Sequence, residues 1–259
     1  MRRARLKTPE KLFSHKQNRK EIVLTLITHC GTTKIGRQEL KHLPVPESTG
    51  TFKPIPHHEL VDALIETLSF RKIGVVKDEY AASPDGMKLF GILELENGFE
   101  GCRFSIGLRN ANDKSMRLAL TAGVRVFVCD NLSFQGEFTP VLAKHSKNFS
   151  ILDSMAIGVD RMQRNFEPMR QHIEEWRALQ ITDETAKLVI YRAFVEGEFE
   201  VPRQLARTVH EDYFNPKFAE FAPRTMWSLE NAFTSALKTL DPIPQFKATA
   251  KLGAFLGRN

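Results

Sequence analysis

The change in hydrophobic period near residue 150 constrains the fold of this chain more than any other sequence feature. Between residues 71 and 132, short apolar segments typical of strands follow one another with only brief turns between them. After residue 150, apolar residues recur at helical spacing through several long segments. Connections this short favour antiparallel pairing, because parallel strands need a long crossover. We therefore predict an α+β protein: an antiparallel β-meander with flanking helices, followed by a mostly helical C-terminal half.

The individual elements follow from the same patterns. Two turns support the meander: Ser83–Gly86 has proline at its second position, and Asn97–Gly101 opens with the Asn-Gly pair common in hairpins. The predicted strands are residues 71–83, 87–96, 102–110 and 124–132, with a short apolar segment at 118–123. The predicted helices are residues 58–70, 151–179, 183–198, 202–214 and 223–240. Residues 21–31 form a strand or a buried segment, and the proline-rich residues 43–58 form an extended connection.

Charge is concentrated at the N-terminus. Residues 1–20 carry eight Lys or Arg and one Glu, which is +7, while the whole chain is +6, so the remaining residues sum to −1. We predict a basic flexible arm at 1–20, an α+β motif-bearing domain at 21–149 and a helical region packed on it at 150–259. A basic arm suits contact with phosphate backbones or an acidic partner, and a solubilising tail is the alternative.

Several classes of protein are disfavoured by what the sequence lacks. No apolar run reaches the roughly 18 residues of a membrane span, and no apolar signal core follows the basic N-terminus. Cys30, Cys102 and Cys129 are far apart and form no Cys-x-x-Cys pair. We expect a cytoplasmic protein with no membrane partner. Dinucleotide and P-loop motifs are absent, as are recognisable catalytic arrangements, so we expect no cofactor and favour a binding protein over an enzyme.

The polar cluster between Ile106 and Phe138 is the place where we expect the function. Five charged, amide or hydroxyl side chains crowd into seven residues between two apolar segments: Arg109, Asn110, Asp113, Lys114 and Ser115. Such clusters are costly next to a core unless they are exposed, paired or used.

Strand alternation suggests how the basic residues of this region are arranged. Phe104, Ile106 and Leu108 belong in the core, so Arg103 and Arg109 turn outward on the other face, and Arg125 has the same parity on the next strand. An arginine-bearing sheet face with a polar rim suits phosphate binding. The candidate nucleic-acid-binding residues are Arg103, Arg109, Asn110, Lys114, Arg117 and Arg125. The alternative is local ion pairing of the arginines with Asp113 or Asp130.

A metal site is the second chemical possibility. Asp113, Asp130 and Glu137 are oxygen ligands of the kind that hard cations prefer. Their spacing matches no metal motif, and no HxH or HExxH pattern makes a zinc site plausible.

The motif itself resembles that of a known family. The segments that carry the likeness read GLRNANDKS and RVFVCDNLSFQGE. They are similar to the core motif of a domain-of-unknown-function family found on phages, plasmids and prophages. The matching residues are Gly107, Arg109, Asn110, Asp113, Lys114, Ser115, Val128, Cys129, Asn131, Phe134 and Gly136. Asn112 stands where the family commonly has His.

The resemblance extends over roughly residues 30–240 and includes the Trp-x-Leu-x-Asn-Ala-x-Thr segment at Trp227–Thr234. It implies a setting on a mobile genetic element and brings no established activity. The expected helix on an antiparallel meander is also similar, at the level of fold, to Rad52-like single-strand annealing proteins.

Three functions from different classes follow. The first is a nucleic-acid-binding protein of a mobile element that acts on single-stranded DNA in annealing or recombination and forms homo-oligomers. The second is a protein-interaction module, such as a host-directed inhibitor or adaptor. The third is a metal-dependent hydrolase or phosphoesterase that uses Asp113, Asp130 and Glu137.

Overall fold

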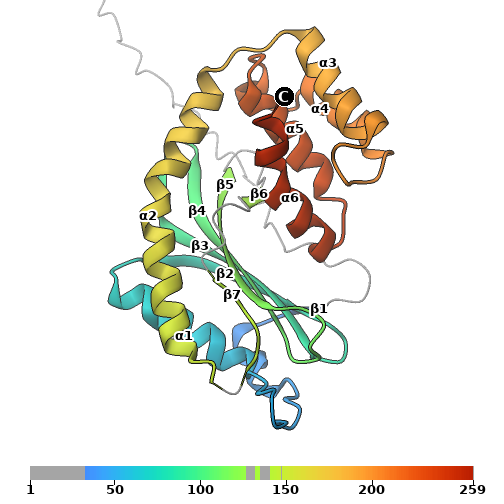
Figure 1. Ribbon diagram of the computed structural model, residues 1–259. Coiled ribbons are helices and arrows are strands. Elements are labelled where there is room, and N and C mark those ends of the chain that lie inside the picture. Colours follow the sequence, from blue (N-terminus) through green and yellow to red (C-terminus); the bar gives the residue numbers. More distant parts are fainter. Residues whose placement is uncertain (1–32, 127–131, 135–140, 147, 259) are drawn as a thin grey trace, which may run out of the picture.

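The computed structural model describes residues 33–126, 132–134, 141–146 and 148–258. A seven-stranded antiparallel sheet occupies the first half, and six α-helices make up most of the remainder of the described chain (Figure 1). The strands are β1 Thr33–Ile35, β2 Val75–Ala82, β3 Lys88–Phe99, β4 Cys102–Ala111, β5 Leu118–Val126, β6 Leu132–Phe134 and β7 Val141–Ala143. The predicted α+β class and the antiparallel meander with a helical C-terminal half are confirmed.

The helices begin with one that precedes the meander and continue after it. The α-helices are α1 His57–Phe70, α2 Ile151–Ala178, α3 Asp183–Tyr191, α4 Leu205–Phe214, α5 Met226–Leu237 and α6 Pro242–Leu256. Two 3₁₀ turns, η1 Arg37–His42 and η4 Ala219–Phe221, and a π-helical turn, η3 Arg192–Glu196, complete the described helical structure.

The sheet follows the order of the chain, because each strand pairs with the one before it from β1 to β6, and β7 also pairs with β5. Two details differ from the sequence prediction. Residues 118–123 and the start of the next predicted strand form one strand, β5. That strand was predicted to run to residue 132, but Leu132 begins β6, which pairs antiparallel with β5, and residues 127–131 lie outside the described residues. The predicted strand at 21–31 and the arm at 1–20 also lie outside them.

The hairpin between β3 and β4 turns later than predicted. β3 continues through Asn97-Gly98 to Phe99, which pairs with Cys102, so Glu100 and Gly101 form the turn. Gly101 takes the left-handed conformation with φ +69°, which glycine adopts without steric cost. Gly98 serves another purpose: a Cβ there would lie 2.4 Å from the Cys102 carbonyl oxygen, so only glycine permits this close approach of the strands.

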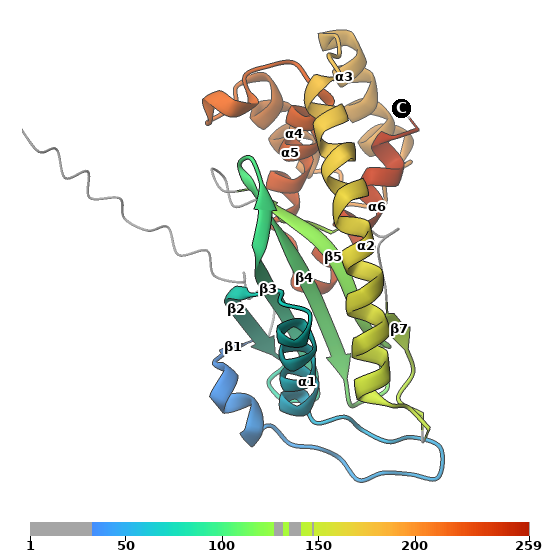
Figure 2. The same ribbon diagram turned by 90° about the vertical axis from the view of Figure 1, so that its left-hand side faces the viewer.

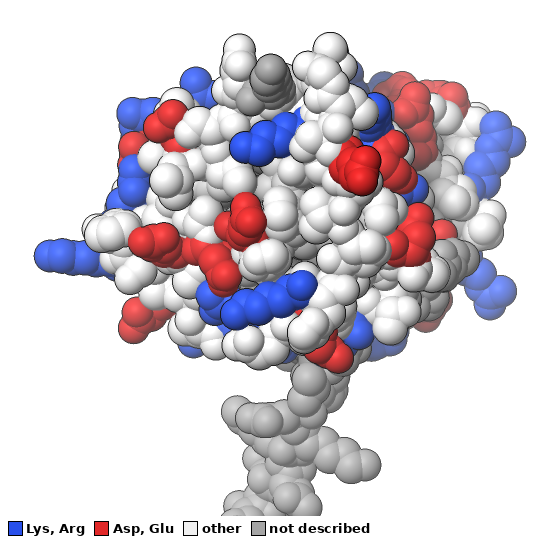
Figure 3. Space-filling view, turned by 90° about the horizontal axis from the view of Figure 1, so that it is seen from below, with Lys and Arg blue, Asp and Glu red and all other residues white. Residues whose placement is uncertain are grey.

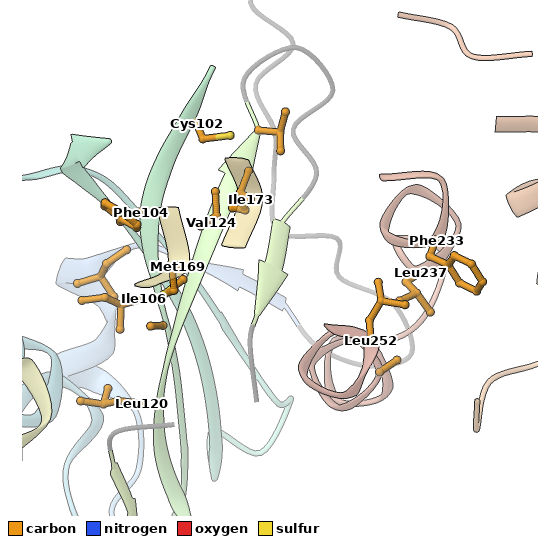
Figure 4. Close-up of a cluster of buried hydrophobic side chains, with 14 of the residues drawn as sticks. Cys102, Phe104, Ile106, Leu120, Val124, Met169, Ile173, Phe233, Leu237 and Leu252 are labelled. Atoms are coloured by element: carbon orange, nitrogen blue, oxygen red, sulfur yellow. The ribbon is translucent and has the colours of Figure 1, made fainter. Parts of the chain in front are cut away.

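One face of the sheet packs against α1 and α2, which lie in front of the strands in Figure 2. Alternate residues of β4 and β5 supply this face, and the ring of Phe104 stacks on Phe166 of α2 at 4.2 Å. Figure 4 shows Met169 and Ile173 of α2 beside the sheet residues, with Phe233, Leu237 and Leu252 of α5 and α6 grouped on the opposite side of the strands. On that side the helical layer reaches the sheet at β6, which α6 contacts.

The tip of the β3–β4 hairpin is fastened to the helical half by Arg177 at the end of α2. Its guanidinium donates to the Glu100 carbonyl oxygen at 3.0 Å and lies 5.2 Å from the ring centre of Trp227 on α5. Trp227 and Asn231, which lie four residues apart on one face of α5, are both buried, and Asn231 donates to the Trp227 carbonyl at 2.9 Å. No described helix is long and apolar enough to cross a membrane.

Candidate nucleic-acid interface

The sheet face directed away from α1 and α2 collects most of the basic residues that the sequence analysis singled out; we call it the basic face. Arg103 lies opposite Arg125 in the β4–β5 register, and Arg109 lies opposite Phe90 of β3. The predicted common face of the three arginines is therefore confirmed. Among the described strand residues, the charged members of this face are Lys34, Lys77, Glu79, Lys88, Glu94, Arg103, Arg109 and Arg125. Six bases against two acids make the face net positive.

Two buried carboxylates link these bases across the sheet. Arg125 on β5 donates to Glu94 of β3 at 2.9 Å and lies 3.5 Å from Glu79 of β2, so its guanidinium crosses over β4. Glu94 also accepts from Arg103 at 2.8 Å, and Glu79 pairs with Lys34 at 3.2 Å. Burial raises the pKa of Glu94, and the hydrogen bonds from the two arginines outweigh that effect, so its pKa lies below the usual range.

Small residues lie beneath the arginines. Ser105 pairs with Gly123, and Gly107 pairs with Thr121, so four neighbouring positions on this face carry little or no side chain. The hydroxyls of Ser105 and Thr121 are buried and have no hydrogen-bond partner among the described residues. Arg109 lies beside this group, and burial lowers the pKa of its guanidinium. A buried polar floor with guanidiniums around it is chemically suited to an anionic group.

The exposure of the arginines differs from the simple expectation that they all turn outward. The Arg103 side chain is 38% exposed and Arg109 is half-buried, whereas Arg125 is only 5% exposed. The reason is the pairing of Arg125 with Glu79 and Glu94, which the sequence analysis did not identify. The predicted alternative of local ion pairing thus applies to Arg125, with carboxylates from β2 and β3 instead of Asp113 or Asp130.

Asn110 lies on the opposite face, with the core residues of β4, and is fully buried. Its amide nitrogen donates to the Ile55 carbonyl at 3.1 Å and to Nδ1 of His57 at 2.9 Å. Asn112 binds the backbone of Ile55 twice: its side-chain oxygen accepts from the Ile55 nitrogen and its amide nitrogen donates to the Ile55 oxygen, both at 3.0 Å. His57 completes the set by donating from Nε2 to the Gly86 carbonyl at 3.0 Å. The two asparagines of the motif therefore fasten the proline-rich connection to the sheet.

The rest of the motif shapes an exposed turn. Oδ1 of Asp113 accepts from the Ser115 backbone nitrogen at 2.9 Å and from its hydroxyl at 2.5 Å. Lys114 takes the left-handed conformation with φ +64°, and its ammonium lies 4.8 Å from the ring centre of Phe52. Arg117 follows and is exposed. Lys114 and Arg117 are thus the most accessible of the predicted nucleic-acid-binding residues.

The candidate metal ligands do not gather in the part of the chain that the structure describes. Asp113 is engaged with Ser115 and pairs with Lys88 at 3.3 Å, and these contacts outweigh its partial burial, so its pKa is lowered. Asp130 and Glu137 lie outside the described residues. No group of three His, Cys, Asp or Glu that could hold a metal ion is found among residues 33–126, 132–134, 141–146 and 148–258.

Two histidines near the motif are buried, which the sequence did not signal. The ring of His145 stacks on that of Phe52, with the ring centres 5.5 Å apart. Both His145 and His57 are buried. Burial lowers the pKa of both imidazoles. His57 accepts at Nδ1 and donates at Nε2, so the neutral form fits its surroundings, whereas a second proton would meet the amide donor of Asn110.

Stability is therefore expected to fall as the pH drops below about 6.5, the pKa of histidine in an unfolded chain. The pKa of both histidines is lower in the folded state, so the unfolded state binds protons at a higher pH than the folded state does. The free energy of unfolding therefore decreases progressively as the pH falls. Urea midpoints at pH 8, 6 and 5 check this. His145→Phe keeps the stacked ring and is expected to reduce the fall between pH 6.5 and 5; an unchanged fall in both H145F and H57Q would contradict the assignment.

Charge on two other parts of the surface is mixed. Viewed from the side that carries η1 and α1, lysines and arginines alternate with aspartates and glutamates, without a large patch of one sign (Figure 3). On α2, Arg170 pairs with both Glu167 and Glu174, the latter at 2.7 Å. The mixed charge on that side contrasts with the excess of bases on the basic face.

Comparison with known proteins places the chain in a family. No curated protein and no solved structure matched the chain. A family model described as a domain of unknown function, DUF932, matches residues 48–250, which include β2 to β7, helices α1 to α5, the first part of α6 and the whole polar motif. The match confirms the predicted membership of a domain-of-unknown-function family. Because it covers most of the sequence, the chain belongs to the DUF932 family.

Proposed function

We propose that this protein binds nucleic acid, with single-stranded DNA as the first candidate, through the basic face and the exposed turn at 113–117. The observation that carries the proposal is the strand register, which gathers Arg103, Arg109 and Arg125 on one side of the sheet. Backbone phosphates are bound mainly by Lys and Arg, and such contacts need no sequence preference.

The individual residues have different roles in this proposal. Arg103, Arg109, Lys114 and Arg117 contact phosphate, since their side chains are at least partly accessible. Arg125 pairs with Glu79 and Glu94, and together with Arg103 and Lys34 it offsets their charge, which keeps the face attractive to anions. Asn110 is a positioning residue, because its amide is buried on the other face and holds the connection beside the turn.

The biological setting is part of the same proposal. The family resemblance implies a mobile genetic element, and a helix-covered antiparallel meander is the feature shared with Rad52-like annealing proteins. We therefore propose a role in annealing or recombination, carried out by a homo-oligomer in the cytoplasm.

The test is fluorescence anisotropy of the full, nuclease-treated chain with a labelled oligo-dT of about 30 nucleotides and a duplex of the same length. Measurements at about 50 and about 200 mM NaCl give the salt dependence. The triple variant Arg109→Ala, Lys114→Ala, Arg117→Ala is expected to bind at least tenfold more weakly at low salt. Its salt slope is expected to fall by about 2, since each phosphate contact with a single strand contributes about 0.7.

A charge-matched variant separates specific contact from loss of net charge. Arg164, Arg203 and Lys217 are exposed residues of the helical half, and their replacement by alanine removes the same charge. It is expected to change the affinity less than twofold. Equal losses in the two triple variants, or affinity independent of salt, would contradict the proposal. Binding lost only when residues 1–20 are removed would place the interface on the arm.

A further inference from the structure

An aromatic ring lies beside the exposed turn at 113–117. Phe52 belongs to the proline-rich connection between η1 and α1, which passes the end of the sheet and reaches the chain that follows β7 (Figure 2). Phe52 forms a β-bridge with Ser146 there, and the Lys53 nitrogen donates to the His145 carbonyl oxygen at 3.3 Å. The Phe52 ring stacks on the imidazole of His145 and is only partly buried. Part of this ring is therefore open to a ligand.

The Phe52 ring is held in place before any ligand binds. The Phe52 nitrogen donates to the Thr49 hydroxyl at 3.2 Å, and the Thr49 nitrogen donates to the Phe52 carbonyl oxygen at 2.8 Å. Behind the ring, His145 is 6% exposed, and neither of its ring nitrogens has a hydrogen-bond partner among the described residues. The stack with Phe52 is thus the contact that its imidazole face makes. A ring fixed in this way loses little side-chain freedom when a ligand stacks on it.

Basic residues lie around the ring. The ammonium of Lys114 lies 4.8 Å from its centre, on an exposed side chain. The pairing of β5 with β7 ends at Leu118 and Ala143. Arg117 and Lys144, the next residue on each strand, therefore lie side by side, and both are exposed. Lysines and arginines from three separate segments thus meet at one place.

The charge of this region is not balanced. The segments that meet here are residues 47–53, 83–88, 113–117 and 143–146. They carry five bases, Lys53, Lys88, Lys114, Arg117 and Lys144, and three acids, Glu47, Asp85 and Asp113, so their net charge is +2. Lys88 pairs with Asp113 at 3.3 Å, whereas the other four bases have no ion-pair partner among the described residues. The surplus favours an anionic ligand.

A fixed, partly open aromatic ring among surplus bases matches the chemistry of a single-stranded nucleic acid. Unpaired bases present their flat faces for stacking, while the backbone supplies phosphates, and a duplex hides those faces. We propose that Phe52 stacks on an unpaired base, with Lys53 and Lys144 on the flanking phosphates. The long Lys114 side chain leaves the ring for a phosphate when the base arrives.

This site adjoins the basic face, because Lys88 of that face pairs with Asp113 of the turn. The inference rests on the proposed binding of nucleic acid and adds to it the residue that selects single strands.

The experiment compares a strand that has bases with one that has none. The full, nuclease-treated chain is titrated with labelled oligo-dT of about 30 nucleotides and with an abasic oligomer of the same length, which carries the same phosphates. The parent chain is expected to bind oligo-dT about tenfold more tightly, because only oligo-dT can stack on the ring. Phe52→Leu keeps an apolar side chain against His145 and is expected to lose that difference, with unchanged affinity for the abasic oligomer.

Two double variants test the phosphate contacts. Lys53→Ala with Lys144→Ala is expected to weaken binding of both oligomers alike, by about tenfold at low salt, because lysines contact the backbone and not the bases. Arg203→Ala with Lys217→Ala removes the same charge from exposed positions of the helical half and is expected to change either affinity less than twofold.

Phe52→Trp gives a direct readout of stacking. The native Trp176 and Trp227 are buried, so a change of emission on binding reports on the introduced side chain. F52W is expected to bind oligo-dT at least as tightly as the parent chain, and its emission is expected to be quenched by oligo-dT and not by the abasic oligomer. Because F52W keeps an aromatic ring, it carries the test even if F52L is not folded at the assay temperature, which thermal unfolding establishes.

Three results would overturn the stacking site: equal affinity of the parent chain for the two oligomers, unchanged affinity of folded F52L for oligo-dT, or emission of F52W that bound oligo-dT does not alter. If one of them occurs while binding stays salt-sensitive and depends on Arg109, Lys114 and Arg117, the basic face binds the strand without Phe52 and the proposed function stands. Absence of salt-sensitive binding to either oligomer would contradict both proposals.

Discussion

Replacement of Arg125 by alanine is expected to lower the free energy of unfolding by about 3 kcal/mol, one of the two largest effects that the structure predicts. The guanidinium is buried and lies against the carboxylates of both Glu94 and Glu79. Its removal leaves two acids in a poorly solvated sheet face, with only Arg103 and lysines nearby to compensate. Urea denaturation followed by circular dichroism measures the change.

Arg103→Ala is the matched control for this prediction. It removes a guanidinium bound to the same carboxylate, but from a side chain that is 38% exposed, so a loss of less than about 1 kcal/mol is expected. The double variant Glu94→Met, Arg125→Met is expected to lose less than the two single variants together, because it removes one of the two acids that the loss of Arg125 leaves without the guanidinium. Strict additivity of the two changes would show that Glu94 and Arg125 do not act as a pair.

Replacement of Asn110 by alanine is expected to cost about 2 kcal/mol, which lowers the midpoint of thermal unfolding by roughly 4–8 °C. The variant leaves Nδ1 of His57 without its donor and removes one of the two amides that bind the Ile55 carbonyl. Differential scanning calorimetry gives the shift.

The same variant separates two explanations of the motif. At a temperature where Asn110→Ala is folded, its affinity for oligo-dT is expected to match that of the parent chain, since Asn110 faces the core. Lys114→Ala should behave in the opposite way, with little change in thermal midpoint and weaker binding. If Asn110→Ala lost affinity without losing stability, the amide would contact the nucleic acid, and the positioning role would be wrong.

The spacing of apolar residues along the sequence predicted the fold well, because it depends on the local geometry of strands and helices. Alternation along β4 and β5 placed Arg103, Arg109 and Arg125 on one face, and the register confirms it. The same alternation assigns Asn110 to the face of Ile106 and Leu108, so its burial could be read from parity alone. Its inclusion among the binding candidates came from the composition of the turn and not from its position on the strand.

Contacts between segments far apart in the sequence could not be predicted from local patterns. His57 follows a proline-rich connection as the first residue of α1, and its partner Asn110 is 53 positions away, so no local pattern signals that the imidazole is buried. Glu79 and Glu94 meet Arg125 only because the guanidinium crosses a whole strand. Such pairings depend on the register and twist of the sheet, which composition does not specify.

The hydrogen bond from Arg177 to the tip of the β3–β4 hairpin also limits where this protein can be labelled. Hairpin tips are the usual choice for an inserted tag or fluorophore, because they are exposed and tolerate added residues. Here an insertion after Glu100 would displace the carbonyl that Arg177 binds and separate the sheet from the layer around Trp227. Gly197, which follows the π-helical turn, has open space where a Cβ would lie and adopts φ +77°, so the loop after it accepts an insertion more readily.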